Sequence, residues 1–273
     1  MEPARGRGMR PLRLFCLPHA GGSAQLYRRW AAAAPPGLEL APLELAGRGV
    51  RLGEPFYLGI REAAEDLLGE VLERREEGRF ALFGHSMGAL IAYELAVLLQ
   101  RAGGPQPEAA FLSAKDAPQV ERREAPIHGL PEALFIERIR RLGGCPDELF
   151  EQPELLRLFL PVLRADFRLV ETYRHQDAPL LETPGVVMGG RADGTLSGSL
   201  GEWRRWFAAP CRLELFEGGH FYAQERHPEL LRRIADILGL APERGGAALA
   251  PLASGAGGGR LGLGGIEEGR NSR

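Results

Sequence analysis

The sequence has few of the residues that would tie it to a metal or to an oxidising compartment. Its 273 residues include three cysteines, at positions 16, 145 and 211. An odd number at such wide spacing forms neither a zinc-binding pattern nor a disulfide framework. We expect Cys16 and Cys211, which lie on or beside predicted strands, to be buried in the core.

Long apolar runs and an excess of basic charge are also missing. No apolar run reaches the roughly 20 residues that a membrane helix needs, and residues 1–11 are basic but lack the apolar segment of a signal peptide. The net charge is −2 with no large basic block, which argues against nucleic-acid binding, and Lys115 is the one lysine among 34 basic residues. We therefore expect a cytoplasmic monomer with no membrane and no nucleic-acid partner.

What the sequence does contain favours one globular domain with an insertion, because 44% of its residues are hydrophobic. Residues 12–117 alternate strands and helices, which predicts a mostly parallel α/β sheet flanked by helices. The segment from about 118 to 180 is helical and amphipathic. We interpret it as a lid over the carboxyl ends of the strands rather than as helical decoration. Strands resume in residues 181–240, and the Gly/Ala-rich residues 241–273 are predicted to be a disordered tail, like the flexible residues 1–11.

Residues 84–88 read Gly-His-Ser-Met-Gly, a G-x-S-x-G motif. The apolar stretch 79–83 before it is typical of a buried strand, and residues 89–99 after it are helix formers. Strand, sharp turn and helix are the context of a nucleophile elbow, in which the serine has strained dihedral angles and is exposed at the top of the sheet. Side chains in place of the two glycines would collide with the strand and the helix. We interpret Ser86 as a nucleophile rather than as a helix-capping serine.

A serine nucleophile needs a general base, which in this fold follows it in the chain. His220 comes just after the predicted strand 212–216 and a Gly-Gly turn, where the base is expected. The other five histidines lie upstream of the serine, beside it, in polar Pro-containing stretches or at a helix entrance: His19, His85, His128, His175 and His227. We predict His220 as the base, against the alternative of a loop histidine packed beside Phe221.

Two aspartates compete to orient that base. Asp193 follows the predicted strand 185–188, and a carboxylate after the penultimate strand is well placed to reach His220. Asp116 follows the strand 109–113, directly after the elbow helix, and some hydrolases of this fold take their acid from that strand. We favour Asp193 and keep Asp116 as the alternative.

The oxyanion of an acyl-transfer reaction needs backbone N–H donors. The residue after the nucleophile, Met87, supplies one of them. The loop 18–23 after the early strand 12–17 contains a His-Ala-Gly-Gly sequence whose glycines let the backbone turn its amides into the site, and we assign the second donor to Ala20. We expect His19 to shape this loop, because no second metal ligand lies near it.

Three motifs together resemble one family. They are residues 17–24 (LPHAGGSA), the elbow at 84–88 and residues 218–222 (GGHFY), and the stretches 142–146 and 158–173 are similar to the lid of that family. The chain resembles the type II thioesterases, the free-standing editing hydrolases of polyketide and nonribosomal peptide assembly lines, over about residues 12–240. Animal medium-chain thioesterases of fatty-acid synthesis are similar.

The resemblance implies an α/β-hydrolase fold and a triad at Ser86, Asp193 and His220, with the oxyanion hole at Ala20 and Met87. It implies hydrolysis of acyl thioesters on the phosphopantetheine arm of acyl or peptidyl carrier proteins, with no cofactor and no metal. The triad alone would also fit an esterase or lipase acting on free esters, or an acyl transferase or cyclase. A non-catalytic carrier-binding module with a decayed site is the alternative from another class, and the intact triad candidates argue against it.

The chain departs from the family at two places. The family usually has Leu-Pro-Gly-Arg where residues 45–48 read Leu-Ala-Gly-Arg, which would loosen the loop without touching a catalytic group. Lys115 and Asp116 stand where two basic residues are expected before Ala-Pro. The second substitution is the reason that Asp116 stays a rival for the acid.

Overall fold

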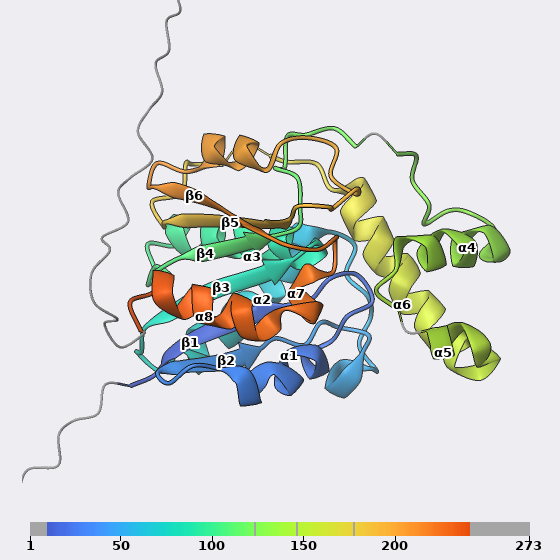
Figure 1. Ribbon diagram of the computed structural model, residues 1–273, viewed down its shortest axis with the longest axis horizontal. Helices are drawn as coiled ribbons and strands as arrows, with labels where there is room; N and C mark the ends of the chain where they lie inside the picture. The colour runs from blue at the N-terminus through green and yellow to red at the C-terminus, as the bar shows by residue number, and fades with distance from the viewer. Residues whose placement is uncertain (1–9, 123, 146, 177, 241–273) are drawn as a thin grey trace, which may run out of the picture. The chain divides into compact units, whose positions relative to one another are not determined.

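A parallel sheet forms the centre of the protein (Figure 1). The computed structural model describes residues 10–122, 124–145, 147–176 and 178–240, and in these ranges six parallel strands pair in the order β2-β1-β3-β4-β5-β6. The strands are β1 (Leu12–Leu17), β2 (Leu38–Pro42), β3 (Phe80–His85), β4 (Ala110–Ser113), β5 (Gly185–Gly190) and β6 (Cys211–Phe216). The predicted α/β architecture is confirmed, with β2 as a strand that the sequence had not indicated individually.

The strand order reverses between β1 and β3, near the centre of the sheet. The chain runs outward from β1 to β2 and then returns to the other side of β1 to form β3. The carboxyl ends of strands at such a reversal are where open α/β sheets bind ligands. The elbow follows β3 and the loop 18–23 follows β1, so both predicted parts of the site lie at this point.

Helices cover both faces of the sheet, and its inner strands β3, β4 and β5 are buried on both sides. In β3, Phe80 and Leu82 belong to one core, and Ala81 and Phe83 belong to the other. This alternation follows from the two-residue period of a strand, and a continuous apolar run is typical of a strand buried on both faces. Helices α2 (Ile60–Arg74) and α3 (Met87–Arg101) cover the first face, and α1 (Ala24–Trp30) and α8 (His227–Ile237) cover the second.

The interval between β4 and β5 contains three helices, which lie beyond one end of the sheet in Figure 1. They are α4 (Glu132–Leu142), α5 (Asp147–Glu151) and α6 (Pro153–Thr172). They share a small core of their own, built around Phe135, Ile139, Leu160 and Leu163. The insertion therefore has a core of its own, while Leu169 of α6 belongs to the core on one face of the sheet. The remaining described helices are short: η1 (Ala31–Ala33), η2 (Gly49–Arg51), η3 (Leu200–Trp206) and α7 (Tyr222–Glu225).

A buried ion pair joins the helical insertion to the sheet domain. Asp166 of α6 accepts two hydrogen bonds of 2.6 Å from the guanidinium of Arg48, one on each carboxylate oxygen. The same carboxylate accepts the backbone N–H of Gly21 at 2.7 Å, and Arg48 also donates to the carbonyl oxygen of Gly22 at 3.1 Å. One side chain therefore connects α6, the loop after β1 and the loop after β2.

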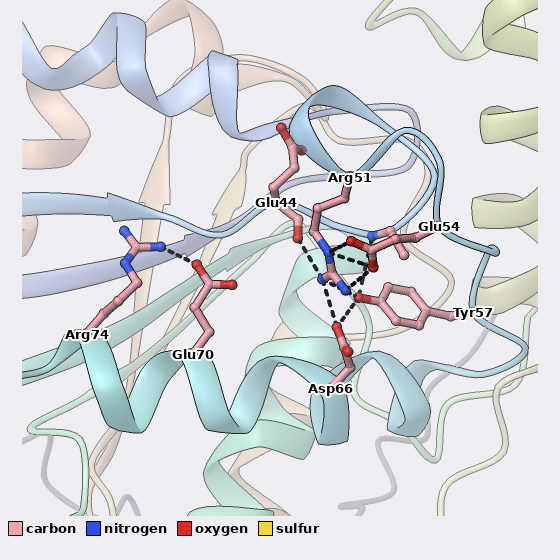
Figure 2. A network of polar contacts seen from close by, with 8 residues as sticks. Glu44, Arg51, Glu54, Tyr57, Asp66, Glu70 and Arg74 are labelled. Carbon is pink, nitrogen blue, oxygen red and sulfur yellow. Dashed lines mark hydrogen bonds and ion pairs between the residues drawn. The ribbon is translucent and has the colours of Figure 1, made fainter.

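The loop after β2 is held on α2 by a second polar network, shown in Figure 2. The guanidinium of Arg51 donates to Asp66 at 2.7 Å, to the hydroxyl of Tyr57 at 3.0 Å and to Glu54 at 2.9 Å. Tyr57 donates to Asp66 at 2.6 Å. Ala46 thus lies in a loop that is anchored at three positions after it, Arg48, Arg51 and Tyr57.

The cysteine prediction holds for one residue and is wrong for the other. Cys16 is buried on β1, whereas Cys211 begins the edge strand β6 and is only half-buried. An edge strand has a neighbour on one side only, so its first residue is less covered. Within the described ranges, none of the helices combines the length and the apolar character that crossing a membrane requires.

We predict that Arg48→Met lowers the free energy of unfolding by about 3–5 kcal/mol, because it leaves the carboxylate of Asp166 buried without its partner. The side chains of Arg48 and Asp166 are 7% and 1% exposed. Urea denaturation measures the change. Arg141→Met is the control, since its ion pair with Glu137 is exposed and its loss should have little effect. Equal losses in the two variants would contradict the anchoring role.

Candidate active site

The elbow has the strained geometry that the sequence predicts. Ser86 lies between β3 and α3 with φ 55° and ψ −113°, a conformation that a residue other than glycine rarely adopts. A Cβ on Gly84 would fall inside contact distance of the backbone of Gly88, and one on Gly88 would do the same with Leu17. The backbone N–H of Ser86 donates to the carbonyl of Ser113 at 2.7 Å. The turn is thus closed on β1 and β4, and both glycines are required sterically.

The structure brings Ser86, His220 and Asp193 together. Nε2 of His220 lies 3.0 Å from Oγ of Ser86, and Nδ1 of His220 lies 2.9 Å from Oδ2 of Asp193. These residues come from the turn after β3, the loop after β6 and the loop after β5. These two contacts are the ones expected between a nucleophile and its base, and between that base and the carboxylate that orients it.

Asp193 is ionised and fixed. Its side chain is fully buried, and burial alone would raise its pKa, but hydrogen bonds from His220 and Thr195 outweigh this effect, so the pKa of Asp193 lies below its usual value. Thr195 donates both its backbone N–H and its hydroxyl to Oδ1, at 3.0 and 2.7 Å. A carboxylate held in this way stabilises the imidazolium that forms when His220 takes a proton.

Asp116, the rival acid, is engaged elsewhere. Its Oδ2 accepts the backbone N–H of Ser197 at 2.8 Å, and its Oδ1 accepts that of Gly198 at 3.0 Å. The residue is 7% exposed. Asp116 therefore holds the loop after Asp193 in place, and the carboxylate that contacts His220 is that of Asp193.

The other histidines have separate surroundings. His85 is buried, with Nδ1 2.8 Å from the hydroxyl of Ser113. Burial, helped by the neighbouring imidazole of His220, keeps the pKa of His85 well below its usual value. Burial, with His220 and Arg48 nearby, lowers the pKa of His19 to about 4. Both rings are therefore neutral at pH 7.

His19 shapes the loop after β1 through ring contacts with His85 and Phe221, at centroid distances of 5.9 and 5.3 Å. Across the described ranges, no group of three or more His, Cys, Asp and Glu side chains is arranged to hold a metal ion. The three remaining histidines contact Glu171, Trp206 and Trp30: His128, His175 and His227, respectively.

The predicted oxyanion donors are the backbone amides of Ala20, at the cavity, and of Met87, at the start of the elbow helix. Ala20 lines the cavity together with Ser86 and His220, and Met87 is the first residue of α3. Among the described residues, neither backbone N–H donates a hydrogen bond, so both amides are available to a substrate oxygen. The oxyanion hole at Ala20 and Met87 stays a prediction that this geometry supports.

Asp166 is the site residue that the sequence analysis did not single out. It fixes the peptide between Ala20 and Gly21 by accepting the Gly21 N–H. Gly21 has φ +79°, and a Cβ there would overlap the side chain of Leu163 on α6. A signal was present, because Asp166 is one of two acidic residues, with Glu171, in the largely apolar buried stripe of α6, and a buried carboxylate requires a partner.

A cavity of about 530 Å³ opens onto Ser86 and His220. Its apolar wall comes largely from the insertion: Ile139, Leu142, Leu163, Phe167 and Val170. The loop at Gly144 lies against the ring of Phe221, next to His220, so closely that a Cβ would not fit. The insertion therefore forms a wall of the reaction site, which would suit an acyl chain.

Known proteins with similar sequences and structures fit this site. A family model described as "Thioesterase domain" matches residues 12–238. The chain is 36% identical over 228 residues to "Thioesterase PikA5" of Streptomyces venezuelae, which covers 83% of this chain and 81% of that protein. Two solved structures are also similar.

One is ClbQ from the colibactin NRPS/PKS pathway, with a TM-score of 0.79 and 32% identity, covering 84% of this chain and 98% of that one. The other is the type II thioesterase BorB from the borrelidin biosynthetic cluster, with a TM-score of 0.75 and 36% identity, covering 87% and 95%. The parallel sheet, the serine elbow and these similarities lead to one conclusion: the chain belongs to the thioesterase family and has the α/β-hydrolase fold.

Proposed function

We propose that this thioesterase removes acyl groups from the phosphopantetheine arm of acyl or peptidyl carrier proteins, with Ser86, His220 and Asp193 as its catalytic triad. The observation that carries the proposal is the chain of hydrogen bonds from Ser86 through His220 to Asp193, beside a cavity that has an apolar wall from the helical insertion. Relatives named for polyketide and nonribosomal peptide pathways support the choice of substrate.

In the acylation step, Nε2 of His220 takes the proton of the Ser86 hydroxyl as Oγ attacks the thioester carbonyl carbon. The negative charge that develops on the carbonyl oxygen is met by the backbone amides of Ala20 and Met87, a contribution of about 3 kcal/mol per donor in hydrolases of this kind. His220 then gives this proton to the sulfur as the carbon–sulfur bond breaks, so that the thiol leaves and the acyl group stays on Ser86.

In the deacylation step, His220 takes a proton from a water molecule as the water oxygen attacks the acyl-enzyme carbonyl carbon. His220 then returns this proton to Oγ of Ser86 as the bond between Oγ and the acyl carbon breaks, so that the acid product leaves and the Ser86 hydroxyl is restored. Asp193 stabilises the charged His220 in both steps. A thiolate is a good leaving group, so protonation of the leaving atom matters less here than in amide cleavage. Every proton transfer in this sequence is assigned to a residue of the site.

We also propose that residues 12–240 form the hydrolase domain and that residues 118–180 act as its lid. Helices α4 and α6 contribute Ile139, Leu163 and Phe167 to the cavity wall. Asp166 anchors α6 to the sheet domain, whereas α4 packs on α6 in the small core of the insertion, so we propose that α4 is the part that opens at low cost, as gates over active sites require. Such a gate would admit varied aberrant acyl groups. The predicted tail, residues 241–273, lies outside the described residues.

The proposal predicts that an acyl group on a carrier protein is released faster than the same acyl group in a free oxygen ester. Thiol release and product mass measure the two rates. In Ser86→Ala both reactions should fall by more than a thousandfold, while circular dichroism stays unchanged. A faster reaction on the free ester would favour the esterase alternative, and activity of Ser86→Ala within tenfold of wild type would remove the serine mechanism.

A second prediction separates the two acids. Asp193→Asn should lower kcat by about 10⁴-fold, since it loses the carboxylate that orients His220. Asp116→Asn is the matched control and should cost far less, because its oxygens accept only loop amides. Thioester hydrolysis at saturating substrate gives both values. The reverse ranking would move the catalytic acid to the end of β4.

A further inference from the structure

A buried network of hydrogen bonds lies beside the elbow. Ser113, the last residue of β4, pairs in register with His85, the residue before the nucleophile. The hydroxyl of Ser113 lies 2.8 Å from Nδ1 of His85 and 2.7 Å from the hydroxyl of Tyr222. None of these three residues, which we call the Ser113 network, is more than 2% exposed. Their side chains take no part in the proposed proton transfers.

The protons of this network have one favoured arrangement. Burial raises the pKa of Tyr222, so its hydroxyl keeps its proton. If Tyr222 donates to Ser113 and Ser113 donates to Nδ1 of His85, both hydroxyl protons have acceptors. In the opposite arrangement, the phenol proton of Tyr222 would have no acceptor within the described ranges, and a buried donor without an acceptor is costly. The network therefore runs from the phenol to the ring of His85.

The network ends beside the base. The ring of His85 lies 5.4 Å from that of His220 between centroids. The pKa of His85 falls chiefly through burial, and the backbone of His220 is close enough to oppose that effect. Tyr222 follows His220 by two residues and begins α7. Two members of the network thus contact or adjoin the loop that carries the base.

That loop needs support, because it contains two glycines before the base. Gly218 has φ +120°, a conformation open to glycine, and such residues lose much freedom when a loop is fixed. The carbonyl of Gly218 accepts the N–H of Ala192 at 2.9 Å, which connects the loop to the turn after β5. Tyr222 connects the other side of the loop to β4 through Ser113.

Ser113 supports the nucleophile as well. Its carbonyl oxygen accepts the backbone N–H of Ser86 at 2.7 Å. β4 pairs with β3 on one side and with β5 on the other, so Ser113 ends a strand in the interior of the sheet. One residue therefore bonds to the backbone of the nucleophile through its carbonyl and to the loop of the base through its hydroxyl.

We propose that Ser113 is a positioning residue, whose hydroxyl network holds the base His220 at hydrogen-bond distance from Ser86. This inference rests on the proposed function and adds a residue that touches neither the substrate nor the reacting atoms. A misplacement of about 1 Å in a catalytic site costs on the order of 10²-fold in rate. Because the network acts through position, its loss should affect the chemical steps more than substrate binding.

The kinetic test removes the two hydroxyls singly and together. Ser113→Ala should lower kcat for a carrier-bound acyl group roughly 10- to 100-fold and change KM by less than about threefold. Tyr222→Phe keeps the ring that stacks on Phe216 and should lower kcat about tenfold. The double variant should be as slow as Ser113→Ala to within about threefold, since both substitutions break the same hydrogen bond, whereas independent effects would multiply.

Tyr57→Phe is the matched control. It also removes a buried phenol hydroxyl, one that bonds to Asp66 and Arg51 in the network of Figure 2. Its kcat should stay within about threefold of wild type, and urea denaturation shows whether each variant is folded in the assay. An unchanged kcat in Ser113→Ala and Tyr222→Phe, an equal loss in the control, or losses that multiply in the double variant would overturn the proposal. If Ser113→Ala does not fold, Tyr222→Phe decides alone.

Labelling with a fluorophosphonate separates this proposal from the proposed function. Oγ of Ser86 forms a bond to phosphorus as fluoride leaves, and His220 takes the serine proton, as in the acylation step. Ser113→Ala and Tyr222→Phe should slow this labelling in the same order as they lower kcat, and unchanged labelling rates in both would overturn the positioning role. A wild-type protein that is labelled at Ser86 but releases no thiol from carrier-bound thioesters would contradict the proposed function instead, and slower labelling of the variants would still support the positioning role.

Discussion

The close approach of three backbone segments at the elbow is the constraint on which the rest of the site depends. Gly84 and Gly88 have no side chains, so the end of β3 and the start of α3 can meet each other and the end of β1 at Leu17. This packing holds Ser86 in a positive-φ conformation that costs of order 1–3 kcal/mol. The neighbouring strands thereby fix the nucleophile, and the loops that follow β5 and β6 bring Asp193 and His220 to it.

The helical insertion takes part in the same arrangement. Asp166 connects α6 to Gly21 in the loop after β1 and to Arg48 in the loop after β2. A movement of α6 would therefore disturb the Ala20–Gly21 peptide, which is adjacent to the peptide that carries the proposed oxyanion donor, the N–H of Ala20. This coupling offers a physical reason why the position of the lid and the competence of the site would change together. The lid would then contribute more than a cover over the cavity.

A residue of the site could be predicted from the sequence when neighbouring residues in the chain indicated its role. The elbow and His220 were predictable because a short motif and its flanking strands specify them. The sequence did not decide fully between Asp193 and Asp116, since both follow strand ends. The structure separates them, because the backbone amides of Ser197 and Gly198 donate to the carboxylate of Asp116. Asp166 escaped prediction because its partner Arg48 lies 118 positions away in the chain. β2 (Leu38–Pro42) was missed because it is short and ends in proline.

The acyl-enzyme is the intermediate that tests this account most directly. The protein is mixed with an acylated carrier protein, quenched in acid within milliseconds, digested and examined by mass spectrometry. The account predicts that the peptide containing Ser86 gains the mass of the acyl group minus one hydrogen, and that Ser86→Ala gives no such peptide. Full turnover in Ser86→Ala, or an acyl group found on a different residue of the wild-type protein, would contradict it.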